Sequence, residues 1–193
     1  VYKMADIIKD IDKLNKSLKD DGLLGKGSIT ISEIFSSSPS RCAVADGCWI
    51  SLDRRMNSNE TPESCMEEIR NLPSVKAVGA KVEMYEYAEP SYTGLVYPIE
   101  KYYPTWVIPK DHELCLLANE CHKELFGEKA VVKPWVFSTN GVSIMGRHNI
   151  TCVGYGPGHE DEAHAPNEKT FKSELIKACA MYAAIASTYD DKI

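Results

Sequence analysis

The sequence predicts two consecutive units, an α+β domain over residues 1–109 and part of an α/β domain over residues 110–193. Three observations support this fold class. The first unit shows patterns in the order helix, strand, strand, helix, strand, strand, which is typical of a small two-layer domain. Its strands alternate apolar and polar residues, as in a sheet with one exposed face. The apolar runs of the second unit do not alternate, which favours a sheet covered on both faces.

The first unit opens with an amphipathic helix and two strands. From Met4 onward, apolar residues recur at spacings of three and four, namely Ile7, Ile8, Ile11, Leu14 and Leu18. This spacing places them on one face of a helix. After a glycine-rich turn, Ser28–Phe35 alternates as a strand does, and a second strand is expected around Cys48–Leu52.

A second helix is predicted to begin after Thr61, which can cap it, with Pro62 and Glu63 in its first turn. Lys81–Ala88 is expected to form a third strand, and Thr105–Ile108 is the best candidate for a fourth. The two helices would cover one face of an antiparallel sheet. A free sheet edge would then be available for pairing with a second copy of the chain.

The second unit is expected to contain two helices and two strands. Asp111 can cap the first helix, and Gly127 ends it. The strands are predicted at 131–137 and 150–155, and Asn167 is expected to cap the last helix. Because two helices and two strands make a poor core alone, this unit is interpreted as part of a larger domain. The chain also opens in mid-helix pattern without an initiator methionine, so we expect it to be a piece of a longer protein.

Composition excludes several classes of function. The net charge of −6 argues against nucleic acid or an anionic membrane as a partner. No apolar run reaches the roughly 20 residues that a membrane span needs, and no signal peptide is visible. The seven cysteines form no CxxC pair, which favours small buried hydrophobic residues in a reducing compartment. A cytoplasmic location is therefore expected.

The stretch Val153–Glu168 is the most informative one, because glycines and Pro157 favour a sharp loop that leads to two histidines. His159 and His164 resemble the zinc motif HExxH, but they stand five residues apart. On a helix they would diverge by roughly 140°. Either histidine could still ligate a metal from a loop, and the alternative is a solvated, charge-rich loop. His164 is the better candidate, because small residues flank it.

Two further sets of residues could bind a ligand. Ser138, Thr139, Asn140 and Gly141 follow a predicted strand end, where α/β sheets bind ligands. The alternative is an ordinary turn, since Asn-Gly is a favoured turn pair. Asp53, Arg54 and Arg55 end the second strand, and an arginine there could hold a carboxylate in a two-pronged pair. The alternative is an exposed, salt-bridged strand end.

Together these pieces resemble the co-catalytic zinc amidohydrolase and peptidase family, which includes acetylornithine deacetylase, succinyl-diaminopimelate desuccinylase, carboxypeptidase G and the aminoacylases. The resemblance covers essentially the whole chain. It rests on Gly156-Pro157-Gly158, Ala163-His164 and Asn167-Glu168, with weaker support from Asp53-x-Arg55 followed by Glu60-Thr61 and from the Ser138–Gly141 loop.

The resemblance implies a peptidase, deacylase or deacetylase that cleaves an amide bond of a small peptide or N-acyl amino acid. Residues 1–109 would be the lid domain, which forms a homodimer, and residues 110–193 the C-terminal part of a catalytic domain with two zinc ions. His164 would match a histidine ligand of one zinc ion. Arg55, Asn140 and Gly141 would hold the substrate, and Gly156 and Gly158 would lie beside the metal site.

The family's other zinc ligands and its catalytic base come from an upstream half, and residues 1–193 do not supply them. One histidine cannot hold a catalytic zinc ion, since such sites use about three protein ligands. The chain alone is therefore expected to bind zinc weakly and to hydrolyse nothing. Two alternatives remain: a non-enzymatic dimerisation or ligand-binding module, and a degenerate member that binds an amino-acid-like ligand without metal.

Overall fold

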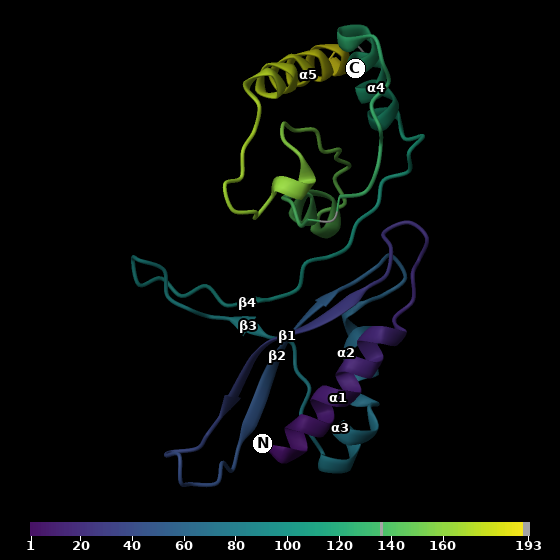
Figure 1. Cartoon of the computed structure of the whole chain (residues 1–193). Coiled ribbons are helices and arrows are strands. Elements are labelled where there is room, and N and C mark those ends of the chain that lie inside the picture. The colour runs from purple at the N-terminus through teal and green to yellow at the C-terminus, as the bar shows by residue number, and fades with distance from the viewer. Residues whose placement is uncertain (136, 191–193) are drawn as a thin grey trace. The chain divides into compact units, whose positions relative to one another are not determined.

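A computed structural model describes residues 1–135 and 137–190 of the chain. The chain divides into two compact units, Val1–Thr105 and Trp106–Ile193 (Figure 1). Helices and short antiparallel strands are both present. The mixed helix and strand content predicted from the sequence is therefore confirmed.

The first unit is built around a hairpin of β1 (Ser28–Ser36) and β2 (Cys48–Arg55), both of which were predicted. The two strands pair antiparallel, with Ser28 opposite Arg55 and Ser36 opposite Cys48. The register shifts between Ile31 and Glu33, as at a β-bulge. Alternation along both strands explains the pairing, since one face of the hairpin is apolar and meets the helices.

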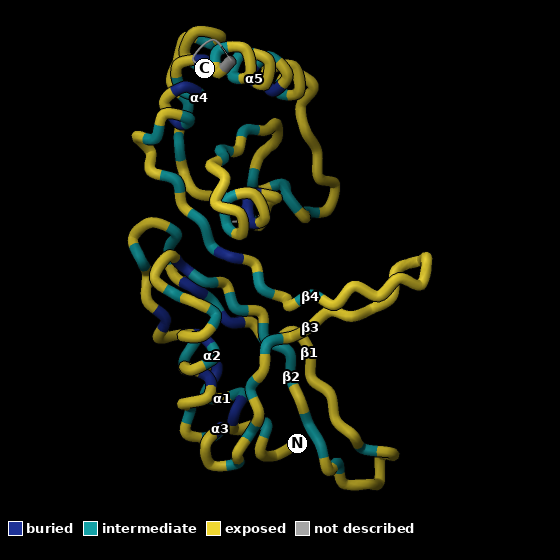
Figure 2. Tube along the Cα trace, turned by 180° about the vertical axis from the view of Figure 1, so that it is seen from behind, coloured by how far each residue is buried: buried dark blue, intermediate teal, exposed yellow. Residues whose placement is uncertain are grey.

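The hydrophobic core of this unit lies between the hairpin and three helices, α1 (Tyr2–Ser17), α2 (Pro62–Arg70) and α3 (Pro73–Val78). Figure 1 shows these helices on the same side of β1 and β2. The buried members are Ile7, Ile11, Leu18, Ile29, Ile69 and Val75. In the burial-coloured tube of Figure 2, the buried segments of this unit lie where helices and hairpin meet. The helices thus pack on one face of a two-stranded hairpin, whereas two helices on a larger antiparallel sheet were predicted.

Helix α2 begins as predicted, and its cap is stronger than expected. The Thr61 Oγ1 accepts from the backbone N–H of Ser64 at 3.1 Å, and the Ser64 Oγ accepts from the N–H of Thr61 at 2.9 Å. Both residues thus satisfy donors that the helix leaves free. Helix α3 was missed. Its first residue is Pro73, and Pro suits the first position of a helix, because its missing N–H is not needed there.

The predicted third and fourth strands are largely wrong. Only β3 (Glu86–Tyr87) and β4 (Ile99–Glu100) pair, and they form a separate two-stranded sheet. Thr105–Ile108 forms no strand. Within the predicted third strand, the Val82 carbonyl accepts from the Arg70 guanidinium at 3.2 Å instead of from a neighbouring strand. Alternation alone cannot supply a partner strand.

Asp21 ties two loops of the first unit together. Its carboxylate accepts from the Ser58 Oγ at 2.6 Å and from the Ser58 N–H at 2.8 Å. The other oxygen accepts from the N–H groups of Leu23 at 2.9 Å and Leu24 at 2.7 Å. The hydrogen bond from the Ser58 hydroxyl, followed by those from backbone N–H groups, holds the pKa of Asp21 well below its usual range.

We expect Asp21→Asn to lower the thermal unfolding midpoint at pH 7. A carboxyl group whose pKa is depressed in the folded state contributes stability above its unfolded pKa of about 3.9. That contribution is lost as pH falls through the lower folded pKa, so the difference from the unmodified protein should shrink below about pH 4. Calorimetry from pH 7 to pH 2 measures it. Asp6→Asn, at an exposed carboxylate 3.6 Å from Lys9, is the control and should change little. A constant difference across pH would contradict the assignment.

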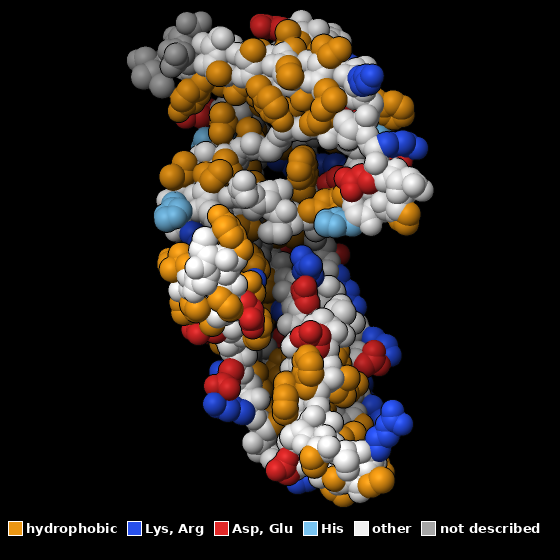
Figure 3. Space-filling model, turned by 90° about the vertical axis from the view of Figure 1, so that its left-hand side faces the viewer, with side chains coloured by type: hydrophobic (Ala, Val, Ile, Leu, Met, Phe, Trp, Pro, Cys, Tyr) orange, Lys and Arg blue, Asp and Glu red, His pale blue; other side chains and the backbone are white. Residues whose placement is uncertain are grey.

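The second unit is organised by two helices, α4 (Glu113–Phe126) and α5 (Lys172–Asp190), which pack through buried Leu117, Cys121 and Met181. Gly127 ends α4 in the left-handed conformation, as predicted. His112 rather than Asp111 caps it, since the His112 Nδ1 accepts from the Leu114 N–H at 3.2 Å. Apolar side chains also cover α5 away from this contact, and hydrophobic residues gather along it at the top of Figure 3. The exposed ones include Leu175, Ile176 and Tyr182.

Three other expectations for this unit are wrong. The segments 131–137 and 150–155 form no strand among their described residues, where no neighbouring strand is available to pair with them. Val136 lies outside the described residues. Helix α5 begins five residues after the predicted cap, because Asn167 takes a left-handed conformation with φ 62°. A π-helix, η1 (Val142–Arg147), was not expected. Within the described ranges, no helix is long and apolar enough to cross a membrane.

Candidate functional site

The glycine-rich loop 153–158 is held against α5 at two points. The Tyr155 carbonyl accepts from the Tyr182 hydroxyl at 2.6 Å, and the Gly158 N–H donates to the Glu174 Oε2 at 2.8 Å. Gly158 has φ 96°, which side-chain-bearing residues rarely adopt. The sequence predicted a sharp loop here, and the structure confirms it. The loop leads directly to the acidic run and its histidines.

His164 lies at the exposed end of this segment. Its φ is 61°, and its backbone N–H donates to the Glu168 Oε2 at 3.2 Å. The imidazole ring is tilted against Phe137, with the ring centroids 6.0 Å apart. The side chain of His164 is exposed, and the hydrogen bond to Glu168 and the Phe137 ring restrict where the imidazole lies. An accessible imidazole can ligate a metal ion.

His159 has a different environment. Its Nε2 stands 3.8 Å from the Glu174 Oε1, and its side chain is mostly exposed. Between the histidines, η2 (Glu160–Glu162) is a single turn of 3₁₀ helix, so the HExxH arrangement is absent here. Glu160 forms an ion pair with Lys133, and Glu162 stands 3.7 Å from Lys169. The acidic run is thus partly neutralised by lysines.

The Ser138–Gly141 loop leads into η1. The Gly141 N–H donates to the Thr139 Oγ1 at 3.1 Å, and the Asn140 carbonyl accepts from the Ser143 N–H at 2.9 Å. Gly141 is buried, with φ −55°, whereas Asn140 is exposed. Phe137 directly precedes this loop, and its ring lies beside that of His164, so the contact joins His164 to the residue before the loop.

Arg55 belongs to the first unit, at the end of β2. Its Nε stands 3.0 Å from the Asp53 Oδ1, and its Nη2 donates to the Asp53 Oδ2 at 3.2 Å. Both side chains are about half exposed or more, at 65% and 48%. The structure therefore shows the salt-bridged strand end, and the guanidinium remains at the surface, where it could change partner. The second unit contains the other candidate site residues, namely Asn140, Gly141, Gly156, Gly158 and His164.

The sequence singled out Arg54 together with Asp53 and Arg55, but it did not predict that Arg54 is the more buried member of this strand end. Its side chain is only 13% exposed, and it pairs with Glu60 and, at 3.0 Å, with the Glu68 Oε2. The signal was present, since Ile50, Leu52 and Arg54 share one face by alternation. Arg54 is therefore a structural ion-pair centre beneath the hairpin.

A metal site needs more than His164. Among the described residues, no group of three or more His, Cys, Asp or Glu side chains could hold a metal ion. A catalytic zinc site uses about three protein ligands. The described residues therefore contain no such site, and zinc ions bound at His164 would need further ligands.

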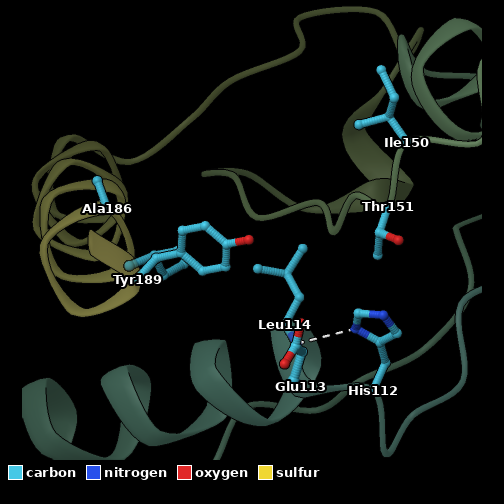
Figure 4. A pocket seen from close by; sticks show the side chains of 8 residues that line it. His112, Glu113, Leu114, Ile150, Thr151, Ala186 and Tyr189 are labelled. Atoms are coloured by element: carbon cyan, nitrogen blue, oxygen red, sulfur yellow. Dashed lines mark hydrogen bonds between the residues drawn. The ribbon is translucent and has the colours of Figure 1, made fainter. Parts of the chain in front are cut away.

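A cavity of about 550 Å³ lies elsewhere in the second unit, between α4, α5 and residues 150–151. Figure 4 shows Tyr189 extending from α5 toward Leu114 at the start of α4. Its lining is mainly apolar, with polar groups from His112, Glu113, Thr151 and Tyr189. It includes none of the residues predicted to bind substrate or metal, so it is separate from the contact between Phe137 and His164.

Comparison with known proteins agrees with the resemblance seen in the sequence. The family model of peptidase family M20/M25/M40 matches residues 15–188. A protein named Uncharacterized protein YgeY in Escherichia coli (strain K12) is 54% identical over 185 residues, which make up 96% of this chain and 46% of that protein. A protein of the same name in Escherichia coli O157:H7 gives the same values. The chain spans about half the length of these curated relatives. It belongs to the peptidase family M20/M25/M40.

Proposed function

We propose that this chain forms the lid domain and the C-terminal part of the catalytic domain of a zinc-dependent hydrolase. The enzyme would cleave an amide bond of a small peptide or an N-acyl amino acid, as a peptidase, deacylase or deacetylase. Family membership supports hydrolysis. The division of the chain into compact units after Thr105 supports a lid over residues 1–109 and a catalytic part over residues 110–193.

The observation that carries the proposal is the contact between Phe137 and His164, with ring centroids 6.0 Å apart. It brings the candidate metal ligand beside the Ser138–Gly141 loop, although the two are far apart in sequence. A hydrolase needs substrate-binding groups close to its reactive centre, because correct placement removes much of the barrier. Two separately predicted pieces that meet are better support than either piece alone.

In this proposal each candidate residue has one role. His164 is a ligand of one of two zinc ions, and the rest of the protein supplies the other ligands. Asn140, Gly141 and Arg55 hold the carboxylate or carbonyl group of the substrate by hydrogen bonds. The backbone of Gly156 and Gly158 lies beside the metal. Zinc would supply Lewis-acid chemistry to the amide bond.

A homodimer formed by the first unit is part of the same proposal. Phe35 and Trp49 stack on the hairpin with ring centroids 6.0 Å apart, and both are exposed, at 44% and 53%. Unpaired strand edges and exposed aromatic side chains favour an interface with a second copy. A cytoplasmic location is also proposed, because the seven free thiols suit a reducing compartment.

The proposal is tested by comparing this chain with a protein extended to the length of its curated relatives. We expect the extended protein to hold zinc and to hydrolyse some members of a panel of N-acetyl amino acids and dipeptides. This chain alone should hold little zinc and hydrolyse none. Zinc is measured by mass spectrometry, amine release by a colorimetric assay, and dimer mass by light scattering on the same samples.

Three outcomes would count against the proposal. Stoichiometric zinc with amide hydrolysis in the 193-residue chain would refute the dependence on other ligands. If the extended protein is strictly monomeric, the proposed homodimer is refuted. A dimeric extended protein without zinc or hydrolysis would favour the second candidate, a non-enzymatic dimerisation or ligand-binding module, for which the exposed Phe35 and Trp49 pair is the supporting observation.

A further inference from the structure

Gly141 has an unusual reason to be glycine. Its conformation does not require glycine, because the φ and ψ of Gly141 are −55° and −27°, which any residue adopts. Space is what forbids a side chain. A Cβ atom at Gly141 would stand 2.7 Å from the Cε2 and 2.9 Å from the Nε1 of Trp106. Contacts that short are essentially never seen, so the indole packs directly on the glycine backbone.

The same residue is also fixed from the other side. The Gly141 N–H donates to the Thr139 Oγ1 at 3.1 Å, and the buried Val142 that follows begins η1. The Asn140 carbonyl accepts from the N–H groups of Ser143 at 2.9 Å and Ile144 at 3.1 Å. Asn140 and Gly141 are therefore held between the start of η1 and the Trp106 indole. Moving the indole would release one side of this loop.

Trp106 occupies a particular place in the chain. It is the first residue of the second unit, directly after Thr105, which ends the first. Its indole is partly buried, whereas the side chain of the following Val107 is 36% exposed. The residue that packs on the predicted substrate loop thus stands at the very start of the second unit.

We propose that Trp106 is a positioning residue for the substrate-binding loop and that Gly141 lacks a side chain so that the indole can hold Asn140 in place. This inference rests on the proposed function, which assigns Asn140 and Gly141 to the substrate. A displacement of about 1 Å in a positioning group can cost roughly 100-fold in rate. The indole therefore sets how well the loop presents its groups to the substrate.

Packing is tested by a double-mutant cycle in the extended protein. Gly141→Ala should lower the thermal midpoint by roughly 5 °C, because it overpacks the site. In a Trp106→Ala background the same change should leave the midpoint unchanged or raise it, because alanine is favourable at a right-handed helical φ once space is available. If Gly141→Ala lowers the thermal midpoint equally in both backgrounds, the indole of Trp106 does not pack on Gly141.

Positioning is tested by kinetics on the N-acetyl amino acid that the unmodified protein hydrolyses best, well below every midpoint. We expect Gly141→Ala and Trp106→Ala to lower kcat/KM by roughly 100-fold at unchanged zinc content. Trp106→Phe should recover part of this loss, because a ring still covers the glycine. Val107→Ala, next to the indole, is the matched control and should keep its kcat/KM.

The possible results separate the two proposals. Suppose that the double-mutant cycle shows that the effects of the Gly141 and Trp106 changes on the thermal midpoint are not additive, but that kcat/KM is unchanged in both variants. Trp106 would then be a structural residue only, and the positioning role would be overturned. If the unmodified protein hydrolyses none of the panel, the proposed function fails and the positioning role fails with it. The stability cycle would still decide whether the indole packs on Gly141.

Discussion

Replacing His164 with alanine in the extended protein is expected to lower both its zinc content and its rate of hydrolysis. The imidazole is exposed, and its place is set by the left-handed backbone, the Glu168 carboxylate and the Phe137 ring. Loss of a group that only orients a metal ligand already costs about 10- to 100-fold. Loss of the ligand itself should cost at least about 100-fold. Zinc per chain and kcat/KM on the best N-acetyl amino acid measure the two effects together.

His159→Ala is the matched control. It removes the same side chain from the same acidic segment, at a mostly exposed position whose nearest charged partner is Glu174 at 3.8 Å. We expect its zinc content and rate to stay close to those of the unmodified protein. If His164→Ala also leaves both quantities unchanged, His164 does not belong to the site. Loss of activity with full zinc content would assign it to the substrate instead of the metal.

Arg54→Ala is expected to destabilise the first unit by about 3 kcal/mol. The guanidinium is 13% exposed, and it lies between Glu60, which is 16% exposed, and Glu68, which is 43% exposed. Its removal leaves Glu60 with an unpaired charge in a partly buried place, which is costly. The partial exposure of Glu68 keeps the estimate at the lower end of the range. Urea unfolding monitored by circular dichroism measures the change.

Arg55→Ala is the natural comparison, because it removes an arginine one position further along β2. Its partner is Asp53, both side chains are largely exposed, and exposed ion pairs contribute about 0–1 kcal/mol. Arg54→Lys should recover only part of the loss, since one atom, the Arg54 Nη2, meets both carboxylates, and the flexible lysine stem does not hold its ammonium group at that position. Similar losses for Arg54→Ala and Arg55→Ala would contradict the burial argument.

The elements that could be predicted are those that local chemistry determines. β1 and β2 follow from alternation, α2 from Thr61 and Pro62, and the end of α4 from Gly127. The segments 131–137 and 150–155 failed, because a strand exists only where another strand accepts its backbone hydrogen bonds. The π-helix η1 was not predicted either, and Gly141, which precedes it, packs against Trp106, a contact between residues distant in sequence.

The candidate site was predictable in its backbone and less so in its side chains. Glycines and Pro157 predicted the loop that leads to His164. The five-residue spacing of His159 and His164 excluded the HExxH helix. The contact between Phe137 and His164 could not be predicted, because it depends on tertiary folding. The close packing of Trp106 on Gly141 could not be predicted either, because in a sequence Gly141 looks like an ordinary turn glycine. The burial of Arg54 could have been predicted, since alternation places it on the inner face of β2.

Asp21 and Ser58 join positions 37 residues apart, and the whole β1–β2 hairpin lies between them. Closing so long a loop is entropically costly until the chain between its ends has become compact. A hairpin forms from neighbouring residues within about 1–10 μs, so it can shorten that loop before the ends meet. The order of folding in this unit should therefore be the hairpin first and the Asp21 anchor afterwards. Changes at Asp21 should then speed unfolding more than they slow folding.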